Sequence, residues 1–218
     1  MFTIVDLTQR ITRQSLSYPG DQVGVAATTL DVGDPEVRVT HLTHLDMHLG
    51  THMDAPLHFF PGAPDIASLG ILLRPAVVVR TRERTIPASL LPTDPLDGRA
   101  VLFDTGWTAN LESPAYYEGY PHLSAELAEA LVSRGVALVG IDTPSADAIN
   151  PATHYPAHRA LLGAGIPIVE GLCNLAQLPE GPDAFRFACF PLKLEGAEGS
   201  PVRAVALLSA PNEAGQRR

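Results

Sequence analysis

The high frequency of proline and glycine, which interrupt helices and strands, is the sequence feature that most restricts the fold of this chain. Twenty prolines and eighteen glycines are spread at short intervals over 218 residues. Because proline and glycine interrupt helices and favour turns, their spacing predicts many short strands and turns with few helices. We find no internal repeat, low-complexity block or interdomain linker, so residues 1–218 are expected to form a single domain.

Short apolar runs between these prolines and glycines predict the strands. The runs lie at residues 3–7, 75–80, 100–103, 136–141, 166–170, 185–192 and 202–208. Continuous apolar runs of this length indicate strands that are covered on both faces.

Helices are expected at two places in the chain. Ser124 is a suitable N-cap, apolar residues follow it at helical spacing, and Gly135 supplies the stop. A shorter helix is predicted at 156–162, with Pro156 at its first position and Gly163 beyond its end. Together with the strands, these helices predict a strand-rich fold of the α/β or α+β class.

The overall composition excludes several classes of protein. Hydrophobic residues make up 45 % of the chain, which is typical of a soluble globular protein. The net charge of −9 and the lack of a basic cluster argue against nucleic-acid binding. The apolar runs are too short to span a membrane and no signal peptide is evident, so we expect a cytoplasmic protein. Cys173 and Cys189 sit in apolar surroundings and are interpreted as core residues.

A cluster of histidines is the strongest functional signal. Five of the eight histidines lie between positions 41 and 58. Alternate residues of an extended chain share a face, and four metal-ligating residue types fall on even positions, namely His48, His52, Asp54 and His58. A helical stripe is the rival geometry, but Gly50 weakens a helix and Pro56 blocks one. We therefore predict an extended segment that ends in a loop.

The residue types of this cluster indicate a catalytic metal site. Imidazole and carboxylate groups suit Zn²⁺ or Mn²⁺, and a site made of His48, His52 and Asp54 leaves an open position for water. Asp54 has two oxygens, so it is able to bridge to a second ion. The second half of the chain offers further ligand candidates at His122, His154, His158, Asp142, Asp147 and Glu170.

Glu170 stands out among these later candidates. It ends an apolar strand, where a carboxylate is costly unless it is paired or bound to a metal. His158 lies on the predicted helix just before that strand. The remaining histidines are interpreted as surface or structural residues, namely His41, His44, His122 and His154.

At this point the sequence resembles a known family. Residues 48–58 read His-Leu-Gly-Thr-His-Met-Asp-Ala-Pro-Leu-His. This run is similar to the His-x-Gly-Thr-His-x-Asp-x-Pro-x-His signature of the metal-dependent cyclase family of hydrolases, to which bacterial kynurenine formamidases (arylformamidases) belong. Further blocks resemble that family at 18–21, 121–124, 139–145, 157–159, 168–171, 191–193 and 200–203.

The resemblance implies a fold, an assembly and a set of site residues. It implies a compact α/β domain of the swivelling β/β/α type that forms a homodimer or homotetramer. It also implies two divalent metal ions per chain, for which zinc is the first choice and manganese the alternative. One ion is held by His48, His52 and Asp54, and the other by Asp54, His158 and Glu170. His58 is the catalytic proton donor and acceptor. Tyr18 lines the substrate pocket, at a position where the formamidases carry tryptophan.

The implied function is hydrolysis of the formamide bond of N-formyl-kynurenine to kynurenine and formate, a step of tryptophan degradation. One alternative is a cyclic amide or lactone hydrolase of the same family, such as an isatin hydrolase. Another is a non-catalytic metal-binding protein. A purely structural zinc site is a further alternative, but such sites prefer cysteine, and neither cysteine is near the cluster.

Overall fold

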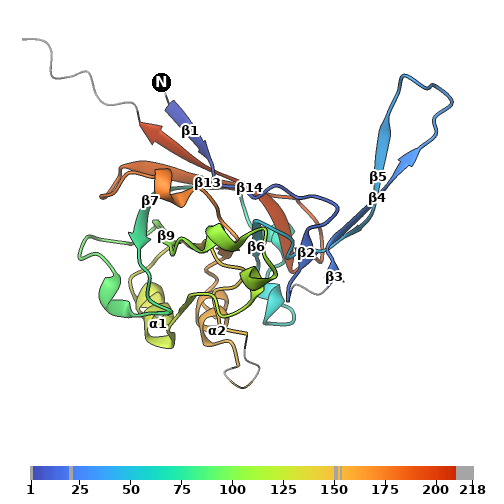
Figure 1. Cartoon of the computed structure of the whole chain (residues 1–218). Helices are drawn as coiled ribbons and strands as arrows, with labels where there is room; N and C mark the ends of the chain where they lie inside the picture. Colours follow the sequence, from blue (N-terminus) through green and yellow to red (C-terminus); the bar gives the residue numbers. More distant parts are fainter. Residues whose placement is uncertain (1, 20–21, 150–151, 153, 210–218) are drawn as a thin grey trace, which may run out of the picture.

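An eight-stranded mixed sheet that closes on itself forms the centre of the molecule (Figure 1). The structure is a computed structural model that describes residues 2–19, 22–149, 152 and 154–209. Its sheet has the order β1-β14-β13-β7-β9-β11-β12-β6, and β6 also pairs with β14. The sheet strands are β1 (Phe2–Asp6), β6 (His52–Asp54), β7 (Leu72–Arg80), β9 (Ala100–Asp104), β11 (Leu138–Ile141), β12 (Ile168–Glu170), β13 (Phe185–Pro191) and β14 (Gly199–Ser209).

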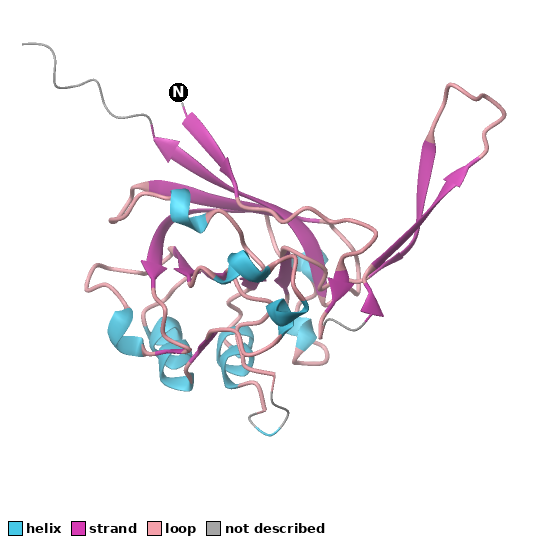
Figure 2. Ribbon diagram, viewed as in Figure 1, coloured by secondary structure: helices cyan, strands magenta, loops and turns pink. Residues whose placement is uncertain are grey.

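Smaller elements surround this sheet. Two helices, α1 (Ala125–Ser133) and α2 (Pro156–Gly163), lie together on one side of it (Figure 2). Three two-stranded pairings are formed by β2 (Leu16–Ser17), β3 (Gln22–Val23), β4 (Val25–Leu30), β5 (Val39–Leu45), β8 (Thr85–Ile86) and β10 (His122–Leu123). Short 3₁₀ turns complete the described part of the chain.

The strand pairings determine which side chains meet. Strands β7, β9, β11 and β12 run parallel, and the remaining pairs of the large sheet are antiparallel. The short strand β6 lies between β12 and the start of β14. Its register with β12 sets Glu170 opposite His52 and Ile168 opposite Asp54. His52 and Glu170, which are far apart in sequence, are therefore adjacent because β6 closes the sheet.

Two apolar cores fill the space on the two faces of the sheet. Alternate residues of β9 enter different cores, with Ala100 and Leu102 in one and Val101 and Phe103 in the other. The second core also contains apolar residues of α1 and α2. The prediction that the apolar strands are covered on both faces is confirmed for β9, β11 and β12 and is wrong for β1 and β13, where residues such as Ile4 and Phe190 are exposed. The strand-rich α/β class is confirmed.

The helices begin where the sequence predicts, but the strands after them begin later. The Ser124 side chain accepts the backbone N–H of Leu127 at 3.1 Å and caps α1. Strands expected from 136 and from 166 begin only at 138 and 168. The reason is that the backbone N–H groups of Val136 and Ile166 donate to carbonyls in the last turns of α1 and α2. The first residues of both apolar runs therefore close the last turns of α1 and α2 and do not belong to the strands.

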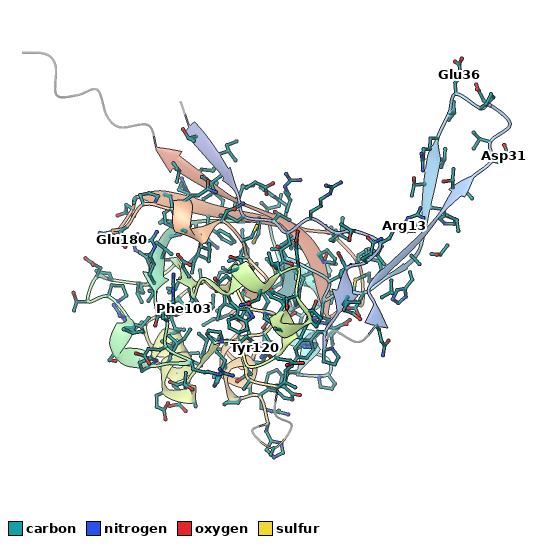
Figure 3. The ribbon with its side chains drawn as sticks, in the orientation of Figure 1. Arg13, Asp31, Glu36, Phe103, Tyr120 and Glu180 are labelled. Carbon is teal, nitrogen blue, oxygen red and sulfur yellow. The ribbon has the colours of Figure 1, made fainter. Side chains whose placement is uncertain are left out.

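A long hairpin of β4 and β5 projects away from the rest of the chain (Figure 1). Asp31 and Glu36 lie near its tip (Figure 3). His41 and His44 are exposed on this hairpin, outside the group of ligating residues described below. The first two histidines of the cluster thus belong to a different structural element.

Two further expectations concern the core and the membrane. Cys173 and Cys189 are both buried and unpaired, so their interpretation as core residues is confirmed. None of the helices in the described ranges combines the length and the apolar character that crossing a membrane requires.

Candidate metal centre

The segment that carries the histidine motif is not one extended stretch. After β5 ends at Leu45 the chain turns, with Gly50 in the left-handed region at φ +63°, and then enters β6. A 3₁₀ turn at Pro56–His58 follows directly. The predicted extended conformation is therefore wrong between residues 46 and 51, because the chain reverses at Gly50. His52 and Asp54 share one face of β6, as alternate strand residues do, whereas His48 joins them through the turn at Gly50 and His58 through the 3₁₀ turn.

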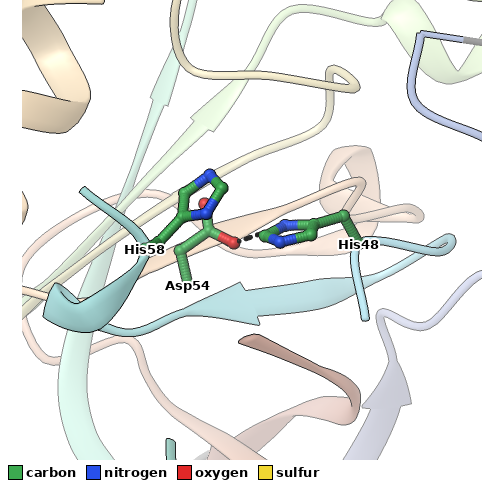
Figure 4. A group of neighbouring side chains, drawn as sticks. All are labelled: His48, Asp54 and His58. Carbon is green, nitrogen blue, oxygen red and sulfur yellow. Dashed lines mark ion pairs between the residues drawn. The ribbon is translucent and has the colours of Figure 1, made fainter. Parts of the chain in front are cut away.

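Asp54 lies at the centre of the site. Its side chain is buried, and within the described part of the chain neither carboxylate oxygen accepts a hydrogen bond of good geometry. Its Oδ1 lies 3.0 Å from Nδ1 of His48 (Figure 4). The same oxygen lies 3.7 Å from Nε2 of His52, and Oδ2 lies 3.3 Å from Nε2 of His158. Burial of an unbonded carboxylate is costly, so this arrangement fits a bound cation.

Glu170 completes the group from the neighbouring strand. Its Oε2 lies 3.4 Å from Nε2 of His52, and its Oε1 lies 3.2 Å from Nε2 of His158. All five predicted ligands are thus brought together. Within the described residues, two sets have ligand atoms close enough for one ion each, His48 with Asp54 and His58, and His52 with Asp54 and Glu170. Asp54 belongs to both sets. The sets differ from the predicted ones, because His58 belongs to the first and His158 to neither, although Nε2 of His158 lies 3.3 Å from Oδ2 of Asp54.

Each predicted histidine ligand is oriented by a partner on its other ring nitrogen. His52 Nδ1 lies 3.0 Å from the carbonyl oxygen of Gly50. His158 Nδ1 lies 2.8 Å from Oδ2 of Asp147. When these Nδ1–H groups donate, the Nε2 lone pairs face Asp54 and Glu170, which is how metal-ligating histidines are usually held.

His48 has the opposite arrangement. Its Nδ1 faces Asp54 and its Nε2 lies 3.3 Å from Oε1 of Glu198. Sequence reasoning missed Glu198, because no motif spacing relates two residues that are 150 positions apart. Asp147, a ligand candidate in the sequence, is placed behind His158 instead.

Charge inside the site is balanced between acids and histidines. Burial lowers the pKa of His48, but the adjacent Asp54 carboxylate outweighs burial and raises that pKa to about 9. Burial by itself raises the pKa of Asp54, yet His48 and His158 hold it well below its usual range. Without an ion, protons on the histidines therefore offset the buried carboxylates. A divalent cation would replace those protons.

His58 differs from the other three histidines. Neither of its ring nitrogens has a hydrogen-bond partner among the described residues. Its ring centroid lies 4.4 Å from that of His48 and 4.9 Å from that of Phe59, and burial lowers its pKa. An unengaged imidazole beside the ligands is free to exchange a proton with a bound molecule. Its catalytic role stays a prediction.

A pocket of about 310 Å³ opens onto these residues. Aromatic side chains from three segments contribute to its wall, namely Tyr18, Phe59 and Tyr155. Tyr155 precedes α2 with φ +53°, and its ring lies 5.7 Å from that of Phe59. A β-carbon makes this left-handed conformation unfavourable, so the surrounding structure must hold it. The remaining lining residues are Asp46, His48, His52, Asp54, His58, Pro144, Ser145, His158 and Glu170.

The three remaining ligand candidates of the sequence, His122, His154 and Asp142, belong to neither set and have no contact with Asp54 or Glu170 among the interactions of the described residues. His122 sits on β10 with its Nε2 3.3 Å from Oγ1 of Thr85. His154 is exposed. Asp142 accepts hydrogen bonds from the backbone and hydroxyl of Thr105 and from the backbone of Trp107, so it stabilises a loop.

The donor set suits a divalent ion. Imidazole nitrogens and carboxylate oxygens surround two unbonded oxygens of Asp54, and no sulfur takes part among the described residues. Such nitrogen and oxygen ligands favour Zn²⁺ or Mn²⁺. The site therefore has the composition of a metal centre.

Sequence comparisons agree with this geometry. The model of the Cyclase family ("Putative cyclase") matches residues 5–148. Kynurenine formamidase from Geobacillus thermodenitrificans is 34 % identical over 206 residues, which cover 92 % of this chain and 95 % of the relative. Kynurenine formamidase from Salinibacter ruber is 34 % identical over 217 residues, which cover 96 % and 99 %. The chain belongs to the cyclase family.

Solved structures share the fold. Isatin hydrolase A from Ralstonia solanacearum superposes with a TM-score of 0.80 at 26 % identity, over 95 % of this chain and 92 % of that one. A structure described as a potential metal-dependent hydrolase with cyclase activity has a TM-score of 0.79 at 24 % identity, over 97 % and 100 % of the two chains. The latter supports the fold alone.

Proposed function

We propose that this protein is a metal-dependent amide hydrolase that cleaves N-formyl-kynurenine to kynurenine and formate. The observation that carries the proposal is buried Asp54, whose two unbonded oxygens lie among three histidines at the floor of an aromatic-walled pocket. Relatives at 34 % identity over nearly the whole chain are kynurenine formamidases, which supports the same substrate.

The metal content belongs to this proposal. We propose that two divalent ions share Asp54, with zinc as the first choice of metal and manganese as the alternative. His48 and His52 would complete one site, and His158 and Glu170 the other. A divalent ion in such a site lowers the pKa of water to about 7 and polarises a carbonyl group.

His58 would manage the proton in this reaction. An anilide nitrogen is a poor leaving group as an anion, so it needs a proton as the bond to the formyl carbon breaks. His58 lines the pocket beside His48 and has no competing hydrogen bond in the described structure. Its neutral imidazole would take a proton from the attacking water and pass it to the leaving nitrogen.

The aromatic wall would hold the substrate ring. Phe59 and Tyr155 pack against each other at the pocket, and Tyr18 borders the same space. Contacts between aromatic rings contribute about 0.5–1.5 kcal/mol beyond the burial of area. This wall therefore favours aryl over alkyl formamides.

Isatin hydrolysis is the second candidate, supported by the superposition with isatin hydrolase A. The test is kcat/KM of the zinc- and manganese-loaded protein on N-formyl-kynurenine, isatin and a simple lactone. We expect N-formyl-kynurenine to be the preferred substrate. A kcat/KM for isatin or the lactone that is higher by about tenfold, or about 1.4 kcal/mol in the barrier, would assign the pocket to cyclic substrates.

Assembly and location are also proposals. The projecting hairpin exposes apolar side chains, with Leu30 42 % and Leu42 53 % accessible, which suits contact with a second copy of the chain in a homodimer or homotetramer. Light scattering of the purified protein tests this assembly. A cytoplasmic location stays a prediction.

A further inference from the structure

A chain of hydroxyl groups leads from the pocket into the protein. The hydroxyl oxygens of Tyr18 and Tyr120 lie 3.2 Å apart, and the Tyr120 hydroxyl donates to the backbone carbonyl of Asp147 at 3.0 Å. The direction of the first hydrogen bond is not fixed by its own geometry, because either hydroxyl is able to donate. The hydrogen bond from Tyr120 to Asp147 determines which of the two hydroxyls donates to the other.

The carbonyl of Asp147 accepts and never donates. Asp147 is buried, and Tyr120 is the one donor to this carbonyl among the described residues. A buried carbonyl left without a donor is costly, so the single hydrogen of Tyr120 is committed to Asp147. The oxygen of Tyr120 must then accept the hydrogen of Tyr18. Burial raises the pKa of Tyr18 to about 12, so its hydroxyl keeps that hydrogen at neutral pH.

Neighbouring groups hold the Tyr18 ring at the pocket. The Tyr117 ring meets it edge-on, with centroids 6.5 Å apart, and the Tyr117 hydroxyl donates to the carbonyl of Leu16 at 2.7 Å. Tyr18 lies on the pocket wall together with His58 and Glu170. The hydrogen of its hydroxyl is already donated to Tyr120, so any hydrogen bond between this oxygen and a bound molecule uses a lone pair of Tyr18.

We propose that Tyr18 is a specificity-determining residue that selects aromatic ligands carrying an N–H donor over matched ligands that carry a methyl group or an acceptor at the same place. The inference rests on the proposed function only in taking this pocket as the substrate pocket. It deepens that function because an aryl amide and its aryl amine product both carry N–H groups, whereas an ester or lactone of the same shape does not.

Calorimetry with matched benzoates tests the proposal without turnover. The probes are the three aminobenzoate isomers and the corresponding methyl- and methoxybenzoates, titrated into the zinc-loaded protein, with the carboxylate common to all. For at least one ring position we expect the amino ligand to bind more tightly than the methyl ligand. The variant Tyr18→Phe should reduce this preference by roughly 3- to 10-fold, the usual worth of one neutral hydrogen bond.

A second variant reverses the polarity. Tyr120→Phe removes the acceptor of the Tyr18 hydrogen, so Tyr18 becomes able to donate to a ligand. We expect Tyr120→Phe to tighten the methoxybenzoate and to change the aminobenzoate little, because a hydroxyl with an uncommitted hydrogen donates and still accepts. A merely structural role for Tyr120 would weaken both. Circular dichroism of each variant checks that it is folded. If Tyr120→Phe does not fold, Tyr18→Phe still tests the proposal, because Tyr18 is only half-buried at the pocket wall.

The outcomes separate this inference from the proposed function. The role of Tyr18 would be overturned if the unsubstituted protein did not prefer the amino ligand to the methyl ligand, or if Tyr18→Phe kept the same preference. It would also be overturned if a folded Tyr120→Phe bound both the amino and the methoxy ligand equally more weakly. An amino preference that depends on Tyr18, in a protein that does not hydrolyse N-formyl-kynurenine, would support the role of Tyr18 and refute the substrate.

Discussion

The carboxylate of Asp147 holds both the backbone and the ring of His158. Its Oδ2 accepts the backbone N–H of His158 at 2.9 Å and lies 2.8 Å from Nδ1 of the same residue, while its Oδ1 accepts the backbone N–H of Ala157 at 3.0 Å. One side chain therefore caps the start of α2 and orients a ligand that this helix carries. The position of α2 and the direction of the His158 lone pair are thus coupled.

Replacing this carboxylate tests the coupling. Both oxygens of Asp147 face N–H donors, so an amide in their place always turns its own NH₂ group toward one of them. We expect Asp147→Asn to weaken metal binding by about 10- to 100-fold, measured by competition with a chromophoric chelator. The matched control is Asp183→Asn, since Asp183 pairs with Arg99 at an exposed site. Equal affinities in the two variants would contradict the role of Asp147.

His58 should separate metal binding from chemistry. We expect His58→Ala to keep its metal and to lose about 10²- to 10⁴-fold in kcat, the usual contribution of a positioned acid–base group. The control is His122→Ala, because among the described residues the ring nitrogens of His122 face only Oγ1 of Thr85 and the backbone carbonyl of Tyr120. Because His58 lies within reach of His48 and Asp54, loss of metal with unchanged turnover per remaining ion would make it a ligand instead.

Gly171 lies between Glu170 and the turn that orients His52. It has φ +64°, and a β-carbon there would collide with the carbonyl oxygen of Gly50, which holds Nδ1 of His52. We expect Gly171→Ala to lower the free energy of unfolding and also the metal affinity. Gly165→Ala is the control, because Gly165 has φ +77° but open space around it, so only the left-handed strain of roughly 1–2 kcal/mol applies. Chemical denaturation and metal titration of both variants decide the matter.

Metal binding should release protons. The pKa of His48 is raised to about 9 without metal, because Asp54 outweighs the opposing effect of burial. Below that pH the imidazole is protonated, whereas a ligand must be neutral, so the affinity for zinc should rise with pH up to about 9 and then level off. Calorimetry at pH 7 in buffers of different ionisation enthalpy counts the protons. An uptake of protons, or no exchange, would contradict this charge balance.

Local sequence patterns accounted for most of the fold. Apolar runs located the sheet strands apart from β6, and the Ser124 cap and the Gly135 stop bounded α1 because both act within one helical turn. The closure of the sheet through β6 was not predictable in this way. That strand has only three residues, and its place depends on pairing with β12 and β14, which are distant in sequence.

The site was predictable as far as residue type and motif spacing extend. His48, His52 and Asp54 share one short segment, and the place of Glu170 at the end of an apolar strand made it a candidate. The resemblance to the cyclase family then assigned His158 and Glu170 to the second ion. The predicted extended conformation of that segment was wrong, because the turn at Gly50 depends on contacts with residues 9 and 171, which are distant in sequence. Outer partners such as Glu198 give no local signal, since their positions are set by tertiary packing.

The count of metal ions per chain tests the central claim most directly, since the account rests on Asp54 shared between two ions. Elemental analysis is made on the zinc-loaded protein, on Asp54→Ala and on the exposed control Asp183→Asn after removal of free metal. The account predicts about two ions per chain in the unsubstituted protein and the control, and close to none in Asp54→Ala, because both sites lose a ligand. No retained metal in the unsubstituted protein, or two ions retained in Asp54→Ala, would contradict it.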